Sequence, residues 1–158
     1  MTTTQQAVAI APQAALAQDA RDISNALLSR SGQALKSGDF EQFASCFAFP
    51  HEIETFAGSN LLETEEDLHQ LFNAVRHKHV AMSVTDMVRH CVSAEFHDDE
   101  TVKATHETRL MNGRFLVQDP YPCFSVIRFL DGAWRVASSC YAIPDAHALQ
   151  DAFMLGTD

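Results

Sequence analysis

The chain has 158 residues, of which 46% are hydrophobic and 20% charged, and its formal net charge at pH 7 is −10. This length fits one domain with a sizeable core, and the composition is that of an ordinary globular protein. We expect neither a nucleic acid nor a membrane as partner, because nucleic acid binds basic patches and a bilayer is spanned by roughly 20 apolar residues.

Two helices are predicted before residue 50. Residues 1–12 are rich in Thr, Gln and Ala and are predicted to be a flexible tail, which leaves a single domain over residues 13–158. From about Gln13 to Ser37 apolar residues recur at helical spacing, and Gly38 fits the left-handed conformation that ends many helices. Asp39 then provides the N-cap of a short second helix. The apolar face of that helix is predicted to be Phe40, Phe43, Ala44 and Phe47.

A strand and a third helix follow. The segment from His51 to Phe56 alternates like a half-buried strand, and Pro50 just before it ends the helical stretch. Thr64 and the acidic residues Glu65–Asp67 predict a helix start, because the helix dipole favours negative charge there. The helix is expected to reach the basic run Arg76–His79. Its buried stripe is predicted to be Leu68, Leu71, Phe72 and Val75.

The second half of the chain is predicted to be a series of strands. Turn residues separate four alternating segments, at about Met82–Phe96, Thr101–Asn112, Tyr121–Leu130 and Ala133–Ile143. Pro144-Asp145 then opens a short C-terminal helix. Helices followed by a strand meander predict an α+β domain with an antiparallel sheet whose helices cover one face.

Both faces of this sheet are expected to be covered. In the strand from Tyr121 to Leu130, one row carries Cys123 and Ile127 and the other carries Phe124 and Val126. A sheet with one face in water alternates more cleanly than this. We therefore expect a homodimer in which a second copy covers the outer sheet face.

The four cysteines indicate the compartment. Cys46, Cys91, Cys123 and Cys140 are far apart in the sequence and form no CxxC motif, and no basic region followed by an apolar run begins the chain. Reduced, buried thiols in the cytoplasm are therefore expected. Neither a cofactor nor a metal is predicted, since no His, Cys or acidic spacing matches a ligand pattern.

Two stretches, ALKSGDFEQFASCFAFPHEIETFAG and FSVIRFLDGAWRVASSCYAI, resemble the nuclear transport factor 2-like superfamily, which includes ketosteroid isomerase, scytalone dehydratase and polyketide cyclases. The resemblance covers roughly residues 13–143. It implies a cone-shaped half-barrel, in which three N-terminal helices wrap a curved antiparallel sheet of four long strands plus a short first strand. It also implies a mostly apolar cavity between the sheet and the helices, and a homodimer.

The resemblance does not extend to the catalytic residues of ketosteroid isomerase. Its tyrosine, its aspartate base and its protonated aspartic acid correspond to Ser31, Thr55 and Ser125 in this chain. A neutral hydroxyl has a pKa far above 7 and does not shuttle a proton in the way these groups do. The chain is therefore predicted to lack this isomerase chemistry.

Three ionisable residues remain candidates for acid–base catalysis: His51, His106 and Glu107. Which row of the strand 101–112 faces the cavity stays open. The resemblance points the row of Thr105, Glu107 and Arg109 inward, whereas the apolar pattern points the row of His106 inward. In the latter case Glu107 and Arg109 are surface or dimer-interface charges, because charged groups are rarely buried.

The expected function is that of a dimeric domain whose cavity binds a small, largely apolar ligand. The alternatives are an enzyme of the isomerase, dehydratase or cyclase type that uses a cavity His or Glu, and a protein-binding adaptor whose acidic surface steers basic partners. The residues predicted to line the cavity are Phe47, Ile53, Thr55, Phe72, Thr105, Arg109, Tyr121, Cys123, Ser125 and Ile127.

Overall fold

The computed structural model describes the backbone of residues 2–143 and 150–154, and the side chains of residues 20–143 and 152–154. Four helices lie in these ranges: α1 (Thr2–Ser37), α2 (Phe40–Ala44), α3 (Glu65–Ala81) and α4 (Gln150–Phe153). The expected start of the last helix at Pro144-Asp145 lies outside the described residues. None of the described helices is both long and apolar enough to cross a membrane.

Local sequence signals set the helix ends. Gly38 has a φ of 83° and its N–H donates to the Ala34 carbonyl over 2.8 Å, which ends α1 as predicted. The Thr64 hydroxyl accepts from the Asp67 N–H and the Asp67 carboxylate accepts from the Thr64 N–H, so a capping box starts α3. Helix α1 already begins at Thr2, so it includes residues 2–12 of the segment 1–12. That this segment is a flexible tail stays a prediction.

Seven strands form one mixed sheet in the order β2-β1-β7-β6-β4-β3, with β5 paired to β4. They are β1 (Phe47–Thr55), β2 (Gly58–Leu62), β3 (Asp86–Asp98), β4 (Thr101–Asn112), β5 (Phe115–Leu116), β6 (Tyr121–Leu130) and β7 (Ala133–Tyr141). The long strands β3, β4, β6 and β7 form the predicted meander of antiparallel neighbours.

Three details differ from the sequence prediction. Strands β1 and β7 pair in parallel, so the sheet is not purely antiparallel. Helix α2 ends at Ala44, well before Pro50, and Phe47 begins β1 instead of extending the helix. The hairpin strand β2, which pairs with β1, was not predicted, because its short sequence GSNLL does not alternate clearly.

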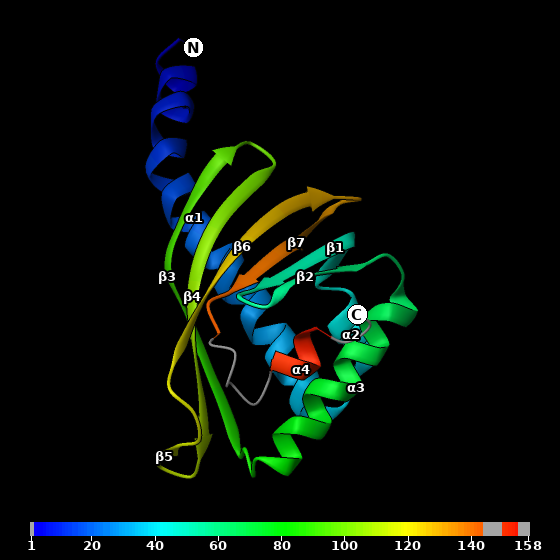
Figure 1. Ribbon diagram of the computed structural model, residues 1–158. Coiled ribbons are helices and arrows are strands. Elements are labelled where there is room, and N and C mark those ends of the chain that lie inside the picture. The colour runs from blue at the N-terminus through cyan, green and yellow to red at the C-terminus, as the bar shows by residue number, and fades with distance from the viewer. Residues whose placement is uncertain (1, 144–149, 155–158) are drawn as a thin grey trace.

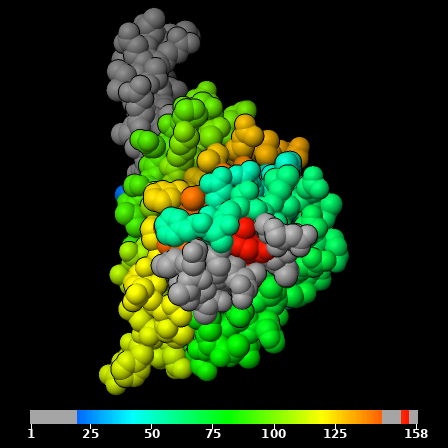
Figure 2. All heavy atoms as spheres, in the orientation of Figure 1, coloured from blue at the N-terminus to red at the C-terminus, as the bar shows by residue number. Residues whose placement is uncertain are grey.

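The sheet curves around the helices to form a cone (Figure 1). Helix α1 packs along β3 on one face of the sheet, while α2 and α3 cover the same face nearer β1 and β2. In the space-filling view α4 lies between the β1–β2 hairpin and α3 (Figure 2), and it contacts both α3 and β1. We call the sheet face toward the helices the inner face and the opposite one the outer face.

The rows of β4 and β6 settle which side chains face inward. Val102, Ala104, His106, Thr108 and Leu110 are all buried, whereas their neighbours along β4 are partly or fully exposed. On β6 the buried row is Tyr121, Cys123, Ser125 and Ile127. The apolar pattern therefore decides the facing of β4 correctly.

Candidate functional site

Arg89 is the most unusual residue of the inner face. It lies on β3 in the inward row of Met87 and Cys91, and its Nη2 donates to the Leu28 carbonyl over 2.7 Å and to the Ser31 hydroxyl over 2.8 Å. Burial lowers the pKa of the guanidinium from its usual value. Both hydrogen-bond acceptors are neutral, so Arg89 places a cation inside the cone without pairing it to a carboxylate in the described part of the chain.

His51, on β1, is held by both ring nitrogens. It is only 1% exposed; Nδ1 lies 3.1 Å from the Val136 carbonyl and Nε2 lies 3.4 Å from the Ser139 hydroxyl. A carbonyl only accepts hydrogen bonds, so Nδ1 carries the proton and Nε2 accepts from Ser139. Burial lowers the pKa of His51 to about 4, although the Val136 carbonyl raises it in part. The imidazole is therefore neutral at pH 7.

His106, on β4, is also buried, with 4% of its surface exposed. Its Nε2 has no hydrogen-bond partner among the described residues. Burial lowers its pKa to about 3, and the positive charge of Arg89 and then His90 adds to this effect. The neutral ring lies beside a void of about 30 Å³ whose lining includes Arg89, Ser125 and Ile127.

The interior of the cone is largely filled. A second void of about 50 Å³ lies between the sheet and the helices α2 and α3, lined by Phe47, His51, Arg89 and Tyr121 among others. Ligand pockets for drug-sized molecules measure roughly 300–1,000 Å³, and one water occupies about 30 Å³ in the liquid. Neither void therefore has room for more than one or two small groups.

A larger hollow lies next to the interior, where α1, the C-terminal end of α3 and the first half of β3 meet. We call it the Arg89 groove, and its volume is about 530 Å³. It shares Arg89, Leu35, His79 and Met87 with the lining of the 50 Å³ void, so groove and interior are neighbours. Its lining is Asn25, Leu28, Ser29, Gly32, Gln33, Leu35, Lys36, Arg76, His79, Val80, Val84, Thr85, Asp86, Met87 and Arg89.

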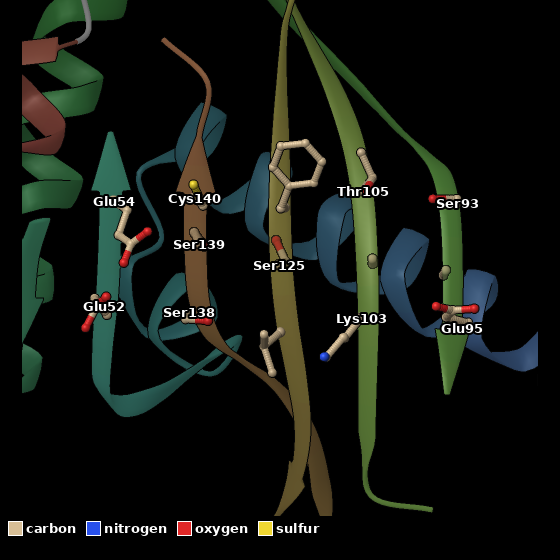
Figure 3. Close-up of a pocket in the computed structure, with 14 residues that line it drawn as sticks. Glu52, Glu54, Ser93, Glu95, Lys103, Thr105, Ser125, Ser138, Ser139 and Cys140 are labelled. Atoms are coloured by element: carbon tan, nitrogen blue, oxygen red, sulfur yellow. The ribbon is translucent and has the colours of Figure 1, made fainter. Parts of the chain in front are cut away.

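A shallow saddle of about 560 Å³ lies on the outer face of the sheet (Figure 3). Glu52 and Glu54 border it on β1, Lys103 borders it on β4, and Phe124 on β6 lies between them with 51% of its surface exposed. A hydrogen bond shared with Glu54 raises the pKa of the Glu52 carboxyl. Burial, followed by the charge of Glu54, raises the pKa of the Cys140 thiol on the neighbouring strand β7.

The structure brings several predicted pocket residues together. Phe47, Ile53 and Tyr121 line the 50 Å³ void, while Ser125 and Ile127 line the 30 Å³ void. The remaining predicted residues of the inner side lie elsewhere: Cys123 is buried in the inner row of β6, Phe72 in the helix-side core, and Thr55 is half-buried at the end of β1. Burial raises the pKa of Cys123 to about 12, so its thiol is protonated.

Thr105, Glu107 and Arg109 are on the outer face and do not line the interior. Glu107 and Arg109 form an ion pair with each other, and each keeps about a third or more of its side chain exposed (34% and 41%). The expectation that Thr105 and Arg109 line the cavity is therefore wrong. Burial of a charged pair is expensive, and the β4 alternation leaves the apolar row to face inward.

Arg76, His79 and Arg89 of the groove were not predicted from the sequence as site residues. Arg89 alternates with Met87 and Cys91, so a charged residue within an apolar row was the available signal. Burial, and then the charge of Arg89, lowers the pKa of His79 to about 4.

Metal and disulfide chemistry find no support in the described residues. No group of three or more His, Cys, Asp or Glu side chains gathers there in a way that would hold a metal ion. Cys46, Cys91, Cys123 and Cys140 are all free thiols, and the first three are buried.

Neither a protein-family model nor a curated protein matches the sequence. Solved structures match the fold. An NTF2-like protein with a cystatin-like fold from Novosphingobium aromaticivorans has a TM-score of 0.63 and 16% identity, over 92% of this chain and 94% of that one. An NTF-2 like protein of unknown function from Shewanella oneidensis MR-1 has a TM-score of 0.61 and 9% identity, over 77% of this chain and 98% of that one.

A third similar structure carries an enzyme's name. It is a ketosteroid isomerase-like protein from Erwinia carotovora atroseptica, with a TM-score of 0.55 and 13% identity over 77% of this chain and 94% of that one. The TM-scores of these structures show a shared fold. Because the sequence identities are low, the function of this chain has to be argued from its own residues.

Proposed function

From the nuclear transport factor 2-like fold of this chain, we propose that it is a homodimeric domain that binds a small, largely apolar molecule in the Arg89 groove. The proposal includes the absence of ketosteroid isomerase chemistry. The Arg89 groove supports the binding proposal, because it adjoins the interior of the cone and its volume of about 530 Å³ falls within the range of ligand pockets.

The groove suits a molecule with an apolar body. Leu28 and Leu35 on α1, Val80 on α3 and Met87 on β3 supply apolar surface, and Val80 is largely exposed. The voids behind it are too small to take the whole molecule. The body of the ligand therefore lies in the groove, and only a small group reaches past Met87 toward the interior.

The chemistry of the interior favours binding over proton transfer. A general base works best with a pKa near the working pH, whereas His51 and His106 have pKa values of about 4 and about 3. His51 also has both ring nitrogens engaged. At the positions that carry over from the isomerase, Ser31 instead hydrogen-bonds Arg89 and Ser125 lines a small void.

Filling the groove is expected to abolish binding of an apolar probe. Gly32 lies on α1, and a Cβ added to it would meet the Arg89 Nη2 at 3.2 Å and the Met87 Cε at 3.7 Å. We expect N-phenyl-1-naphthylamine, a neutral dye that fluoresces in apolar surroundings, to bind the wild type saturably and Gly32→Phe at least tenfold more weakly. Fluorescence titration measures both affinities.

The matched control is Asn73→Phe, which adds the same side chain to the exposed side of α3 outside the groove. It should bind the dye like the wild type. Equal dye affinity in Gly32→Phe and the wild type would contradict the proposed site. Failure of the wild type to bind the dye would contradict the binding function.

The dimer proposal is supported by the outer face. Phe124 and Val126 on β6 and Val88 on β3 are apolar and lie outward, and Phe124 and Val88 are each about half exposed (51% and 48%). Rotating a second copy about an axis parallel to the strands places its β4 over β1 of the first. Lys103 of each copy then faces Glu52 and Glu54 of the other. The opposite charges and the apolar contact therefore both favour this arrangement of the two copies.

Phe124→Glu is expected to convert the dimer to a monomer, because it places a carboxylate in the middle of the apolar part of the interface. Multi-angle light scattering at micromolar concentration should give twice 17.5 kDa for the wild type and 17.5 kDa for the variant. Phe115→Glu makes the same change at a side chain that is 75% exposed on β5, away from the saddle, and should leave the dimer intact. A wild-type mass of 17.5 kDa would refute the dimer.

A further inference from the structure

We infer that the molecule held in the Arg89 groove is a small carboxylic acid, and that Arg89 receives its carboxylate. The inference deepens the proposed binding function and rests on it. It starts from an arginine that the described part of the chain surrounds with neutral acceptors, next to a groove large enough for a ligand.

The hydrogen bonds of Arg89 leave part of its guanidinium available. Both bonds to described residues come from Nη2, to the Leu28 carbonyl and the Ser31 hydroxyl. They fix the orientation of the planar group through α1, while Nε and Nη1 keep their donors for a ligand. A carboxylate oxygen that accepts from one of them makes a charge-assisted hydrogen bond, which is stronger than a bond between neutral groups.

The electrostatic environment of Arg89 lacks a counter-charge. The acidic groups that act on it are the phenols of Tyr121 and Tyr141 and the thiols of Cys123 and Cys46. Burial raises the pKa of each of these groups, so all four are neutral at pH 7. A partly buried cation without a charged partner is costly, and a bound anion offsets that cost.

The groove itself is cationic, although the chain carries a formal net charge of −10. Lys36, Arg76 and Arg89 line it, and its one acidic lining residue in the described chain, Asp86, is paired with Lys36 over 3.2 Å. Arg76 donates through Nε to the Leu35 carbonyl over 2.9 Å, and its guanidinium lies over the Phe72 ring. Arg76 therefore adds to the lining a second cation that pairs with no carboxylate among the described residues.

The apolar lining selects the class of anion. Leu28, Leu35 and Met87 line the groove together with Arg89 and give a ligand apolar surface beside the guanidinium. A carboxylate on a short aromatic or branched aliphatic body satisfies both halves of the site. Its acidic head meets the guanidinium and its body covers the apolar wall.

The test compares an acid with its neutral isostere. Isothermal titration at pH 7.5 uses 3-phenylpropionate and 3-phenylpropionamide, which differ in charge and scarcely in shape. We expect the wild type to bind the acid at least tenfold more tightly than the amide, and Arg89→Gln to bind the acid and the amide with equal affinity. Arg114→Gln removes one exposed cation elsewhere and should keep the preference.

The outcomes separate the two proposals. Equal affinity for acid and amide, with dye binding intact, overturns the carboxylate inference and leaves the binding function standing. Absence of both acid and dye binding overturns the binding function as well. Inorganic phosphate that binds competitively with the dye, where the acid does not bind, overturns the choice of carboxylate.

A second measurement needs no variant and so does not depend on how Arg89→Gln folds. Burial, and then the positive charge of Arg89, lowers the pKa of His79, and a bound carboxylate would offset that charge. The His79 pKa should therefore be higher with 3-phenylpropionate bound than with 3-phenylpropionamide bound, because the two ligands bury His79 alike and differ in charge; ring-proton shifts in NMR titrations follow it. An acid that binds and gives His79 the same pKa as the bound amide does not place its charge at Arg89, and that result overturns the inference.

Discussion

Acidification from pH 7 to pH 5 is expected to lower the free energy of unfolding by about 4 kcal/mol, a large part of the roughly 5–15 kcal/mol that folded domains possess. This value counts His51 and His106, which are buried and neutral; His79 is less buried, and its lowered pKa adds to the loss. Burial lowers their pKa values to about 4 and about 3, from 6.5 in an unfolded chain. Each contributes about 2 kcal/mol of the loss at pH 5.

The sign follows from proton binding. Both folded pKa values lie below the unfolded value, so the unfolded chain binds more protons once the pH falls below about 6.5. The stabilisation is fully present above that pH. It is lost progressively as the pH falls toward about 4 for His51 and about 3 for His106. Urea unfolding at pH 7 and at pH 5 measures the difference directly.

Substitutions assign the effect to each ring. His106→Gln keeps a polar side chain that does not titrate, and it should reduce the loss of stability by about 2 kcal/mol. His51→Asn should do the same, because the Asn amide can donate to the Val136 carbonyl as Nδ1 does. His97→Gln is the control, since His97 is exposed on β3. A wild-type stability that is equal at pH 7 and pH 5 would show that these rings are not buried in solution.

The elements that sequence reasoning located well are those with local determinants. The ends of β4 and β6 are as predicted, at Thr101–Asn112 and Tyr121–Leu130, because turn residues and alternation act over a few positions. The start of α3 was readable for the same reason, since Thr64 and Asp67 cap each other across one turn. The meander then dictates the α+β architecture.

The features that were not predicted from the sequence depend on residues far apart in the chain. The parallel pairing of β1 with β7 joins Ile53 to Ser139, and no local pattern specifies it. The resemblance pointed Thr105 and Arg109 into the cone, and only the burial of their neighbours corrected it. For the facing of β4, the alternation of apolar residues therefore gave the correct prediction and the resemblance gave the wrong one.

The candidate site was less predictable than the fold. Arg89 matters because α1 brings the Leu28 carbonyl and the Ser31 hydroxyl to it, across about 60 residues of sequence (separations of 61 and 58). A register shift in β3 between Cys91 and Ser93 also interrupts the alternation that would have marked its row as inward. A site built from tertiary contacts leaves only a faint local signal, here a cation in an apolar row.

Phe72→Ala is expected to lower the free energy of unfolding by about 3–5 kcal/mol, the usual cost of removing a buried phenylalanine ring. Phe72 is 2% exposed on α3, and its ring centroid lies 4.9 Å from that of Phe43 and 5.5 Å from that of Phe40, both on α2. Losing the ring leaves a cavity between the two helices that a rigid core closes only in part. Urea unfolding at pH 7 measures the loss.

Phe56→Ala is the matched control, because Phe56 is 70% exposed and its removal should change stability by less than about 0.5 kcal/mol. A loss under about 1 kcal/mol in Phe72→Ala would mean that α3 packs loosely on α2. Loose packing there would also affect the ligand site. The Phe72 ring lies under the Arg76 guanidinium at 5.6 Å, so the packing that stabilises the core also positions one of the cations of the Arg89 groove.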